Sequence, residues 1–87
     1  MNYAESNKQK GIEVRKRMLN AIKDYIQQHG YPPTVREIGD IVGLYSTSSV
    51  HAHLQRMLAD GALETDHPGM PRAIRVPGMR IVFEEVG

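Results

Sequence analysis

The sequence contains no cysteine. This absence excludes disulfides, thiolate chemistry and cysteine-based zinc sites, and it is compatible with a reducing compartment. No apolar run approaches the roughly 20 residues that a membrane-spanning helix needs. The N-terminal residues also lack the apolar segment of a secretory signal. We therefore expect a cytoplasmic protein without membrane contact.

The chain of 87 residues is short and has an uneven charge distribution. A chain of this length has room for one small domain, so a large enclosed substrate cavity is not expected. Residues 1–23 carry six basic and two acidic side chains, whereas the remainder carries five basic and eight acidic ones. Such a basic region suits an anionic partner approached from one side, and a solvated helix face explains it equally well.

The first periodic segment predicts an amphipathic helix over about residues 12–29. Its apolar positions recur at spacings of three and four, and Gly30 supplies the left-handed residue that ends a helix. The polar residues 1–11 show no such period. We predict that they form a flexible N-terminal arm.

A second, short helix is predicted after the extended "YPP" turn. The stretch "TVRE" at 34–37 is a capping box, in which the threonine hydroxyl and the glutamate side chain satisfy orphan backbone donors. The helix ends at Val42, before Gly43. Ile38, Ile41 and Val42 form its expected apolar stripe.

The third predicted helix, residues 47–60, has two contrasting faces. Val50, Leu54 and Met57 fall on the side expected to pack on the core. The opposite face is small, polar and almost uncharged. It consists of Thr47, Ser48, His51, Ala52 and Gln55.

The helical period is lost after residue 60. Two short extended segments, "ALET" at 62–65 and "RAIRV" at 72–76, flank a turn-rich insert, so a β-hairpin is predicted. Alternation in the second segment places Ile74 and Val76 inward and Arg75 outward. The C-terminal extension, 77–87, contains another possible strand or a dimerisation segment.

Three helices, the last two joined by a tight glycine-containing turn, and then a hairpin make the order of a winged helix-turn-helix. The predicted fold is thus mainly α with a small β-hairpin, over residues 12–76. In that geometry the third helix enters the DNA major groove. Its hydroxyl, imidazole and amide groups can bond base edges, and Ala52 can contact a thymine methyl group. The Ser and Thr residues at its start suit a phosphate at the positive end of the helix dipole.

The stretches "GYPPTVREIG", "STSSVHAHL" and "PRAI" occur in this order within residues 29–76. This region resembles the N-terminal DNA-binding domain of LexA-type SOS-response repressors. The resemblance implies a sequence-specific regulator of transcription, most simply a repressor and not an enzyme. Its helix 47–60 would read the major groove, and its wing 62–76 would contact the backbone or the minor groove. No cofactor or metal is implied.

The resemblance and the outward face of helix 47–60 together give the predicted interface. The predicted base contacts are Ser46, Ser48, Ser49, His51, Ala52 and Gln55. The predicted backbone or wing contacts are Arg36, Thr47, Arg72 and Arg75.

The sequence departs from the family in the wing and at its end. Glu64 and Thr65 stand where many members carry basic residues, which weakens the expected attraction of the wing to phosphate. The family's self-cleaving domain, with its serine–lysine dyad and most of the dimer interface, would follow this region, and the sequence stops about ten residues after the wing. Duplex DNA is the expected partner, bound by a homodimer on a palindromic operator or together with another protein.

Three other interpretations apply to these residues. His51 and His53 project from a helix about 200° apart and cannot readily chelate one metal ion. A serine nucleophile needs an oriented base, whereas a hydroxyl run at a helix start is more often capping. A protein-interaction module that binds a transcription regulator or a polymerase subunit stays open, since Glu64 and Asp66 place acid near the wing. His53 is expected to pack rather than to contact bases.

Overall fold

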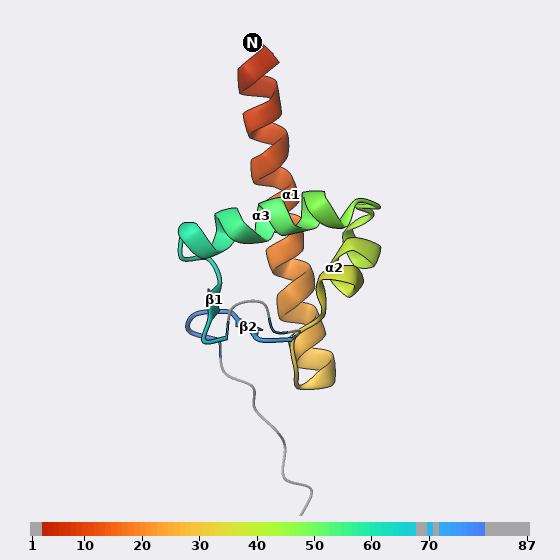
Figure 1. Ribbon diagram of the computed structural model, residues 1–87, viewed down its shortest axis with the longest axis vertical. Coiled ribbons are helices and arrows are strands. Elements are labelled where there is room, and N and C mark those ends of the chain that lie inside the picture. Colours follow the sequence, from red (N-terminus) through yellow and green to blue (C-terminus); the bar gives the residue numbers. More distant parts are fainter. Residues whose placement is uncertain (1–2, 68–69, 71, 80–87) are drawn as a thin grey trace, which may run out of the picture.

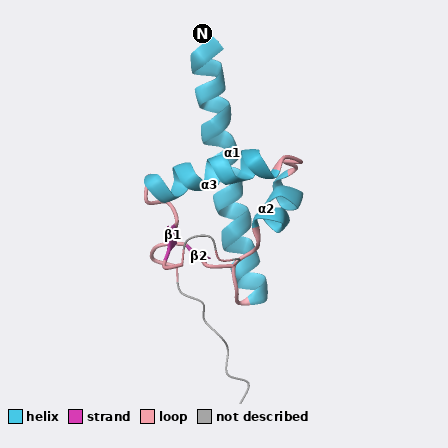
Figure 2. Ribbon diagram, in the orientation of Figure 1, coloured by secondary structure: helices cyan, strands magenta, loops and turns pink. Residues whose placement is uncertain are grey.

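The computed structural model describes residues 3–67, 70 and 72–79. Three helices, α1 (Tyr3–His29), α2 (Val35–Val42) and α3 (Thr47–Ala59), precede the strands β1 (Glu64–Thr65) and β2 (Ile74–Arg75). Figure 1 shows α3 crossing α1 near its middle, with α2 on one side and the strands below α3. Helix dominates the structure (Figure 2), and the two strands pair antiparallel. The predicted winged helix-turn-helix, mainly α with a small hairpin, is confirmed.

The core lies where α1, α2, α3 and the base of the wing meet. Each helix contributes an apolar stripe at helical spacing, because residues three and four apart share one face. Met18 and Ile22 of α1 and Ile38 of α2 are completely inaccessible to solvent. The other buried apolar side chains are Ile26, Val42, Val50, Leu54, Met57, Leu63 and Val76.

Helix α1 begins much earlier than predicted. It starts at Tyr3, so residues 3–11 are helical and not an irregular arm. Figure 1 shows this N-terminal part extending beyond the other helices. Once a helix has formed, each further residue adds a hydrogen bond without a new nucleation step. Ala, Glu, Lys and Gln also favour helix intrinsically, so the absence of an apolar period did not mark the boundary.

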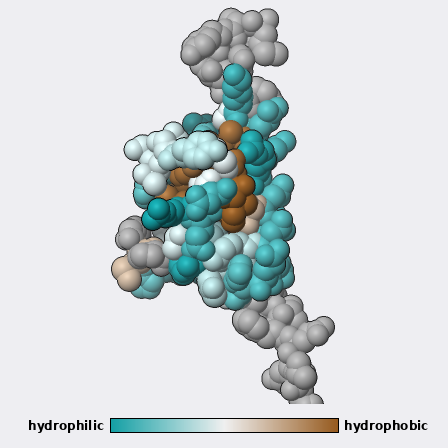
Figure 3. Space-filling model, turned by 90° about the vertical axis from the view of Figure 1, so that its right-hand side faces the viewer, coloured by the Kyte–Doolittle hydropathy of each residue, from teal (hydrophilic) through white to brown (hydrophobic). Residues whose placement is uncertain are grey.

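The predicted apolar stripe of α2 is wrong at one position. Ile38 and Val42 are buried, but Ile41 is 52% exposed, and Val35 packs against the core in its place. Figure 3, which views the side of the molecule that carries α2, shows hydrophobic surface surrounded by hydrophilic side chains. At about 100° per residue, Val35 and Val42 lie on one side of Ile38 and Ile41 lies on the other, so Ile41 falls outside the buried arc of α2.

The wing is short and anchored at its base. Thr65 pairs with Ile74 in the two-residue strands, which are briefer than the predicted segments. Val76 is buried and Ile74 packs against the core, whereas Arg75 is exposed, as the alternation predicted. The expectation of a further strand near the C-terminus concerns mainly residues 80–87, which lie outside the described residues.

The turn between α2 and α3 requires a glycine inside α2. A Cβ at Gly39 would lie 2.8 Å from the carbonyl oxygen of Leu44 and 3.3 Å from a methyl group of Val50. The first distance is below any ordinary contact, and the backbone oxygen cannot move aside as a flexible side chain can. The turn itself passes through Gly43 in the left-handed conformation, at φ 78°. Gly39 therefore permits the close approach of the two helices.

Gly39→Ala should destabilise the fold, since the methyl group must displace the chain at Leu44. Overpacking of this kind typically costs about 1–3 kcal/mol. Gly11→Ala is the matched control, because a Cβ there meets only the mobile end of Arg15 and alanine favours helix by about 1 kcal/mol. Urea unfolding followed by circular dichroism would measure both changes. Equal effects of the two substitutions would contradict the steric argument.

Candidate nucleic-acid interface

A serine hydroxyl caps the N-terminus of α3. Ser46 is the N-cap in extended conformation, and its side-chain oxygen accepts a hydrogen bond from the Ser49 backbone N–H at 3.4 Å. This bond satisfies one of the donors that every helix start leaves open. The first turn of α3 contains no acidic residue, so the positive end of the helix dipole faces solvent without a neutralising carboxylate.

Burial divides α3 into the two predicted faces. Val50, Leu54 and Met57 are buried and hold the helix on the core. The predicted contact residues on and before the helix are all exposed: Ser46, Thr47, Ser48, Ser49, His51, Ala52 and Gln55. The exposed face offers hydroxyl, imidazole and amide groups and a methyl group. It has donors and acceptors in several directions but no carboxylate.

An open groove of about 1000 Å³ separates this face from the wing. His51 and Gln55 line it from α3, Thr65 and Arg75 line it from the wing, and Thr34 lines it from the start of α2. The tertiary structure thus brings together three of the predicted contact residues, two from α3 and one from a strand. Glu64 also lines the groove.

The three predicted arginine contacts have different surroundings. Arg36 is exposed on α2 and makes no ion pair within the part of the chain that the structure describes. Arg75 forms ion pairs at 3.1 Å with Glu64 and with Asp66. Arg72 does not line the groove, and its guanidinium lies 2.6 Å from Glu37. The structure therefore turns Arg72 toward the protein.

His53 occupies the boundary between the two faces of α3. It is half-buried, and its Nδ1 lies 3.4 Å from Nη1 of Arg15 on α1. Burial, and secondarily the positive charge of Arg15, lower the pKa of His53 below its usual 6.5. The expectation that His53 packs, while His51 faces outward, is confirmed.

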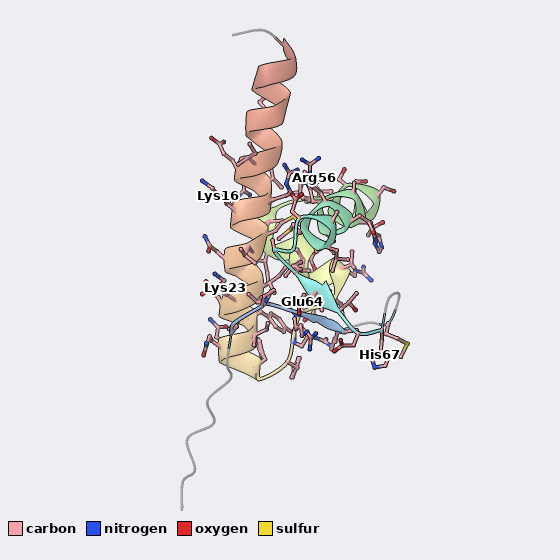
Figure 4. All side chains as sticks on the ribbon, turned by 90° about the vertical axis from the view of Figure 1, so that its left-hand side faces the viewer. Lys16, Lys23, Arg56, Glu64 and His67 are labelled. Carbon is pink, nitrogen blue, oxygen red and sulfur yellow. The ribbon has the colours of Figure 1, made fainter. Side chains whose placement is uncertain are left out.

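The basic residues of α1 do not all belong to this surface. Figure 4 shows Lys16 and Lys23 pointing to the side of α1 opposite to α3 and the wing. Arg17 donates a hydrogen bond to the carbonyl of Val42 at the end of α2. Because α2 has no basic residue in its own last turn, Arg17 supplies the cation that a helix C-terminus favours. Part of the positive charge near the N-terminus therefore stabilises the fold and is not available to a partner.

Sequence reasoning missed two residues beside the interface. Thr34 was assigned only to capping, yet it also lines the groove. Tyr45, which directly precedes the Ser46 cap, is fully exposed. The position of Tyr45 directly before the third helix could have indicated a place in the interface, but Tyr45 belongs to no periodic pattern in the sequence.

The described residues contain no cluster of His, Asp or Glu side chains that could hold a metal ion. Within the same part of the chain, no helix is both long and apolar enough to span a membrane.

Comparison with known proteins agrees with this geometry. The family model of the LexA DNA-binding domain matches residues 9–73, which include α1 from residue 9 onward, the whole of α2 and α3, and the wing up to Ala73. The chain belongs to the LexA DNA-binding domain family. The match is to a DNA-binding domain and not to an enzyme.

LexA repressors are similar over the same region. The LexA repressor of Limosilactobacillus reuteri is 51% identical over 59 residues, which is 68% of this chain and 28% of the relative. That of Lacticaseibacillus casei is 52% identical over 61 residues, or 70% of this chain and 29% of the relative. That of Staphylococcus aureus is 51% identical over 59 residues, or 68% of this chain and 28% of the relative. The chain therefore spans less than a third of the length of these LexA relatives.

Stability should fall on mild acidification because of His53. Its pKa in the folded protein is lower than the unfolded value near 6.5, so the unfolded chain binds the proton more tightly. The free energy of unfolding should therefore decrease as the pH falls below about 7, and His53→Gln should flatten this dependence. Thermal unfolding between pH 7.5 and 5 would measure it. A wild-type slope that survives the substitution would assign the dependence to another group.

Proposed function

We propose that this protein is a sequence-specific repressor of transcription that binds double-stranded DNA, with an SOS-type operator as the first candidate. The observation that carries the proposal is the exposed, almost uncharged, hydrogen-bonding face of α3 in a member of the LexA DNA-binding domain family. Major-groove recognition needs such a face, because base edges present donors, acceptors and thymine methyl groups at close range. A location in the cytoplasm, where bacterial DNA lies, belongs to the same proposal.

Base recognition falls to the exposed face of α3. His51 and Gln55 carry groups that can donate and accept toward base edges, and Ser48 can do so through its hydroxyl. Ala52 leaves room for close approach and can contact a thymine methyl group. Ser46 and Ser49 lie at the helix start; since a hydroxyl that accepts the capping bond still has its own proton, Ser46 can also donate to DNA.

Backbone contacts surround this face. The N-terminus of α3 offers unneutralised backbone N–H groups and the Thr47 hydroxyl to a phosphate. Arg36 and Arg75 add positive charge from α2 and from the wing, and the fully exposed Tyr45 adds a further hydroxyl. The groove between α3 and the wing lies beside these groups, and Arg75 lines it from the wing.

The ion pairs of the wing bear on the alternative function. The acidic residues Glu64 and Asp66 favoured a protein-binding module, but both carboxylates pair with Arg75. One guanidinium thus faces two carboxylates, so their negative charge is only partly compensated. All three side chains are about half exposed to solvent. Ion pairs exposed in this way contribute only about 0–1 kcal/mol to stability. Breaking such a pair costs little, so Arg75 can still reach a phosphate, but the released carboxylates repel that phosphate and make the wing a weaker DNA contact than α3.

Specific operator binding by a single winged helix is expected to be weak. Operators with two-fold symmetry are read by two copies, each bound to one half-site. We therefore extend the proposal to two protomers on a palindromic site, or one protomer with another DNA-bound protein. Light scattering of the protein with and without a duplex would count the copies, and a one-to-one complex on a palindrome would contradict the first form.

Substitutions on the exposed face should change base preference. Ser48→Ala and His51→Ala should each lose about 1–3 kcal/mol of discrimination between the preferred duplex and one altered at a single base pair. Binding to unrelated DNA should change little, since phosphate contacts dominate it. Selection from a random duplex library, followed by fluorescence anisotropy, would define the preferred site and measure both values.

Lys23→Gln is the control for these substitutions, because the lysine points away from α3 and should leave the preference intact. Wild-type protein that selects no sequence, and binds an SOS-type operator and scrambled DNA equally at low salt, would contradict the proposal. Binding to a regulator protein instead would favour the interaction module.

The dependence of affinity on salt separates two basic residues. Each phosphate contact contributes about 0.9 to the slope of log affinity against log salt concentration. Arg36→Gln should reduce this slope by about that amount, whereas Lys23→Gln should leave it nearly unchanged. Anisotropy titrations at four or more salt concentrations would measure the slopes. Equal reductions would show that α1 and α2 both face the DNA.

A further inference from the structure

The guanidinium of Arg72 joins the base of the wing to the junction between α1 and α2. It forms the ion pair with Glu37 at 2.6 Å, and its Nη1 donates to the carbonyl of Pro32 at 3.0 Å and to the Tyr25 hydroxyl at 3.3 Å. The same group lies 4.8 Å from the centre of the Tyr31 ring, a distance typical of cation–π contact. Four contacts from three segments thus converge on one side chain.

Glu37 is the second centre of this cluster. Its backbone N–H donates to the Thr34 hydroxyl at 3.2 Å, and its carboxylate accepts from the Thr34 hydroxyl at 2.9 Å. The Tyr25 hydroxyl also donates to this carboxylate. The hydrogen bond from Tyr25 above all, then those from Thr34 and the charge of Arg72, lower the pKa of Glu37 to about 2. The carboxylate is therefore ionised at any physiological pH and connects α1, α2 and the wing.

The backbone at Arg72 adapts to these contacts. It has a φ of 59° and is, among the described residues, the non-glycine residue with positive φ. Residues with a Cβ rarely adopt this left-handed conformation. The rare conformation occurs where the side chain makes its ion pair, which is consistent with contacts that hold it in place.

The wing needs such an attachment. Its strands contain two residues each, and a hairpin this short is not stable by itself in water. Val76 is buried after β2, and Arg72 is fixed before it. The strand is thus held at both ends. Thr34, the capping partner of Glu37, lines the groove opposite the wing, so the cluster lies against the wall of that groove.

We propose that Arg72 is a positioning residue that sets the wing relative to α3 through its ion pair with Glu37, and that it is not a phosphate contact. This proposal refines the DNA-binding function, because it concerns how the groove between α3 and the wing keeps its width. The attachment also gives the wing base a definite place although the sheet is minimal.

The first test uses the free protein and does not depend on DNA. Arg72→Gln and Glu37→Gln should both accelerate amide hydrogen exchange in residues 64–65 and 74–75 by about tenfold, relative to α3. Glutamine at position 37 can still complete the capping box, so α2 should persist. Arg56→Gln, which removes an arginine from an exposed ion pair on α3, is the matched control. Unchanged exchange in the wing of both variants would overturn the proposal.

The second test uses DNA and rests on a difference of sign. Glu37→Gln removes a negative charge, so electrostatics alone predicts equal or tighter DNA binding. A positioning role predicts binding to the preferred duplex that is weaker by about fivefold or more, with an unchanged salt slope. Arg72→Lys should not restore binding to the wild-type level, because a lysine ammonium group cannot reproduce the planar, bidentate hydrogen bonding of the guanidinium. The double variant should bind no more weakly than Arg72→Gln.

A phosphate contact would give a different pattern. Arg72→Gln would then reduce the salt slope by about 0.9 while Glu37→Gln bound like the wild type, and that result would falsify the positioning role. If the wild type shows no sequence preference, the proposed function fails, and the exchange measurement still decides whether Arg72 and Glu37 position the wing.

Discussion

The close approach of the Leu44 carbonyl to Gly39 sets where α3 can lie. Because a Cβ at position 39 would be 2.8 Å from that oxygen, only glycine lets the turn fold back onto α2. The turn then delivers Ser46 to the N-cap and Val50 to the core. The exposed face of α3 follows from this geometry, since a helix fixed by its buried side has no freedom left to rotate its polar side.

Charge in this protein is used more for internal attachment than its composition suggests. Arg17 caps the end of α2, Arg15 contacts His53, and Arg72 joins the wing to Glu37. These contacts lie between segments far apart in the sequence. The surface proposed for DNA is, by contrast, weakly charged on α3 itself. Such a division suits specific recognition, because direct readout depends on donors and acceptors whereas phosphate attraction is indifferent to sequence.

The wing shows how a minimal sheet can still be positioned. Two residue pairs cannot define its orientation, so the burial of Val76 and the contacts of Arg72 must contribute. Glu64, the acidic residue that departs from the family pattern, shares Arg75 with Asp66. Residues 62–76 carry two acidic and two basic side chains. The wing therefore has no net positive charge, and α3 is left as the principal proposed determinant of specificity.

The sequence by itself determined the order of elements, the capping box at Thr34, the buried stripe of α3 and the outward face around His51, because these depend on local spacing and on hydrogen bonds between near neighbours. It missed the start of α1, since helix extension needs no apolar period, and it misplaced Ile41, since burial depends on which arc a neighbouring helix covers. Only the tertiary structure decided that Arg72 turns inward to Glu37. Those residues are 35 positions apart, and no periodicity in a chain encodes a contact between side chains brought together by folding.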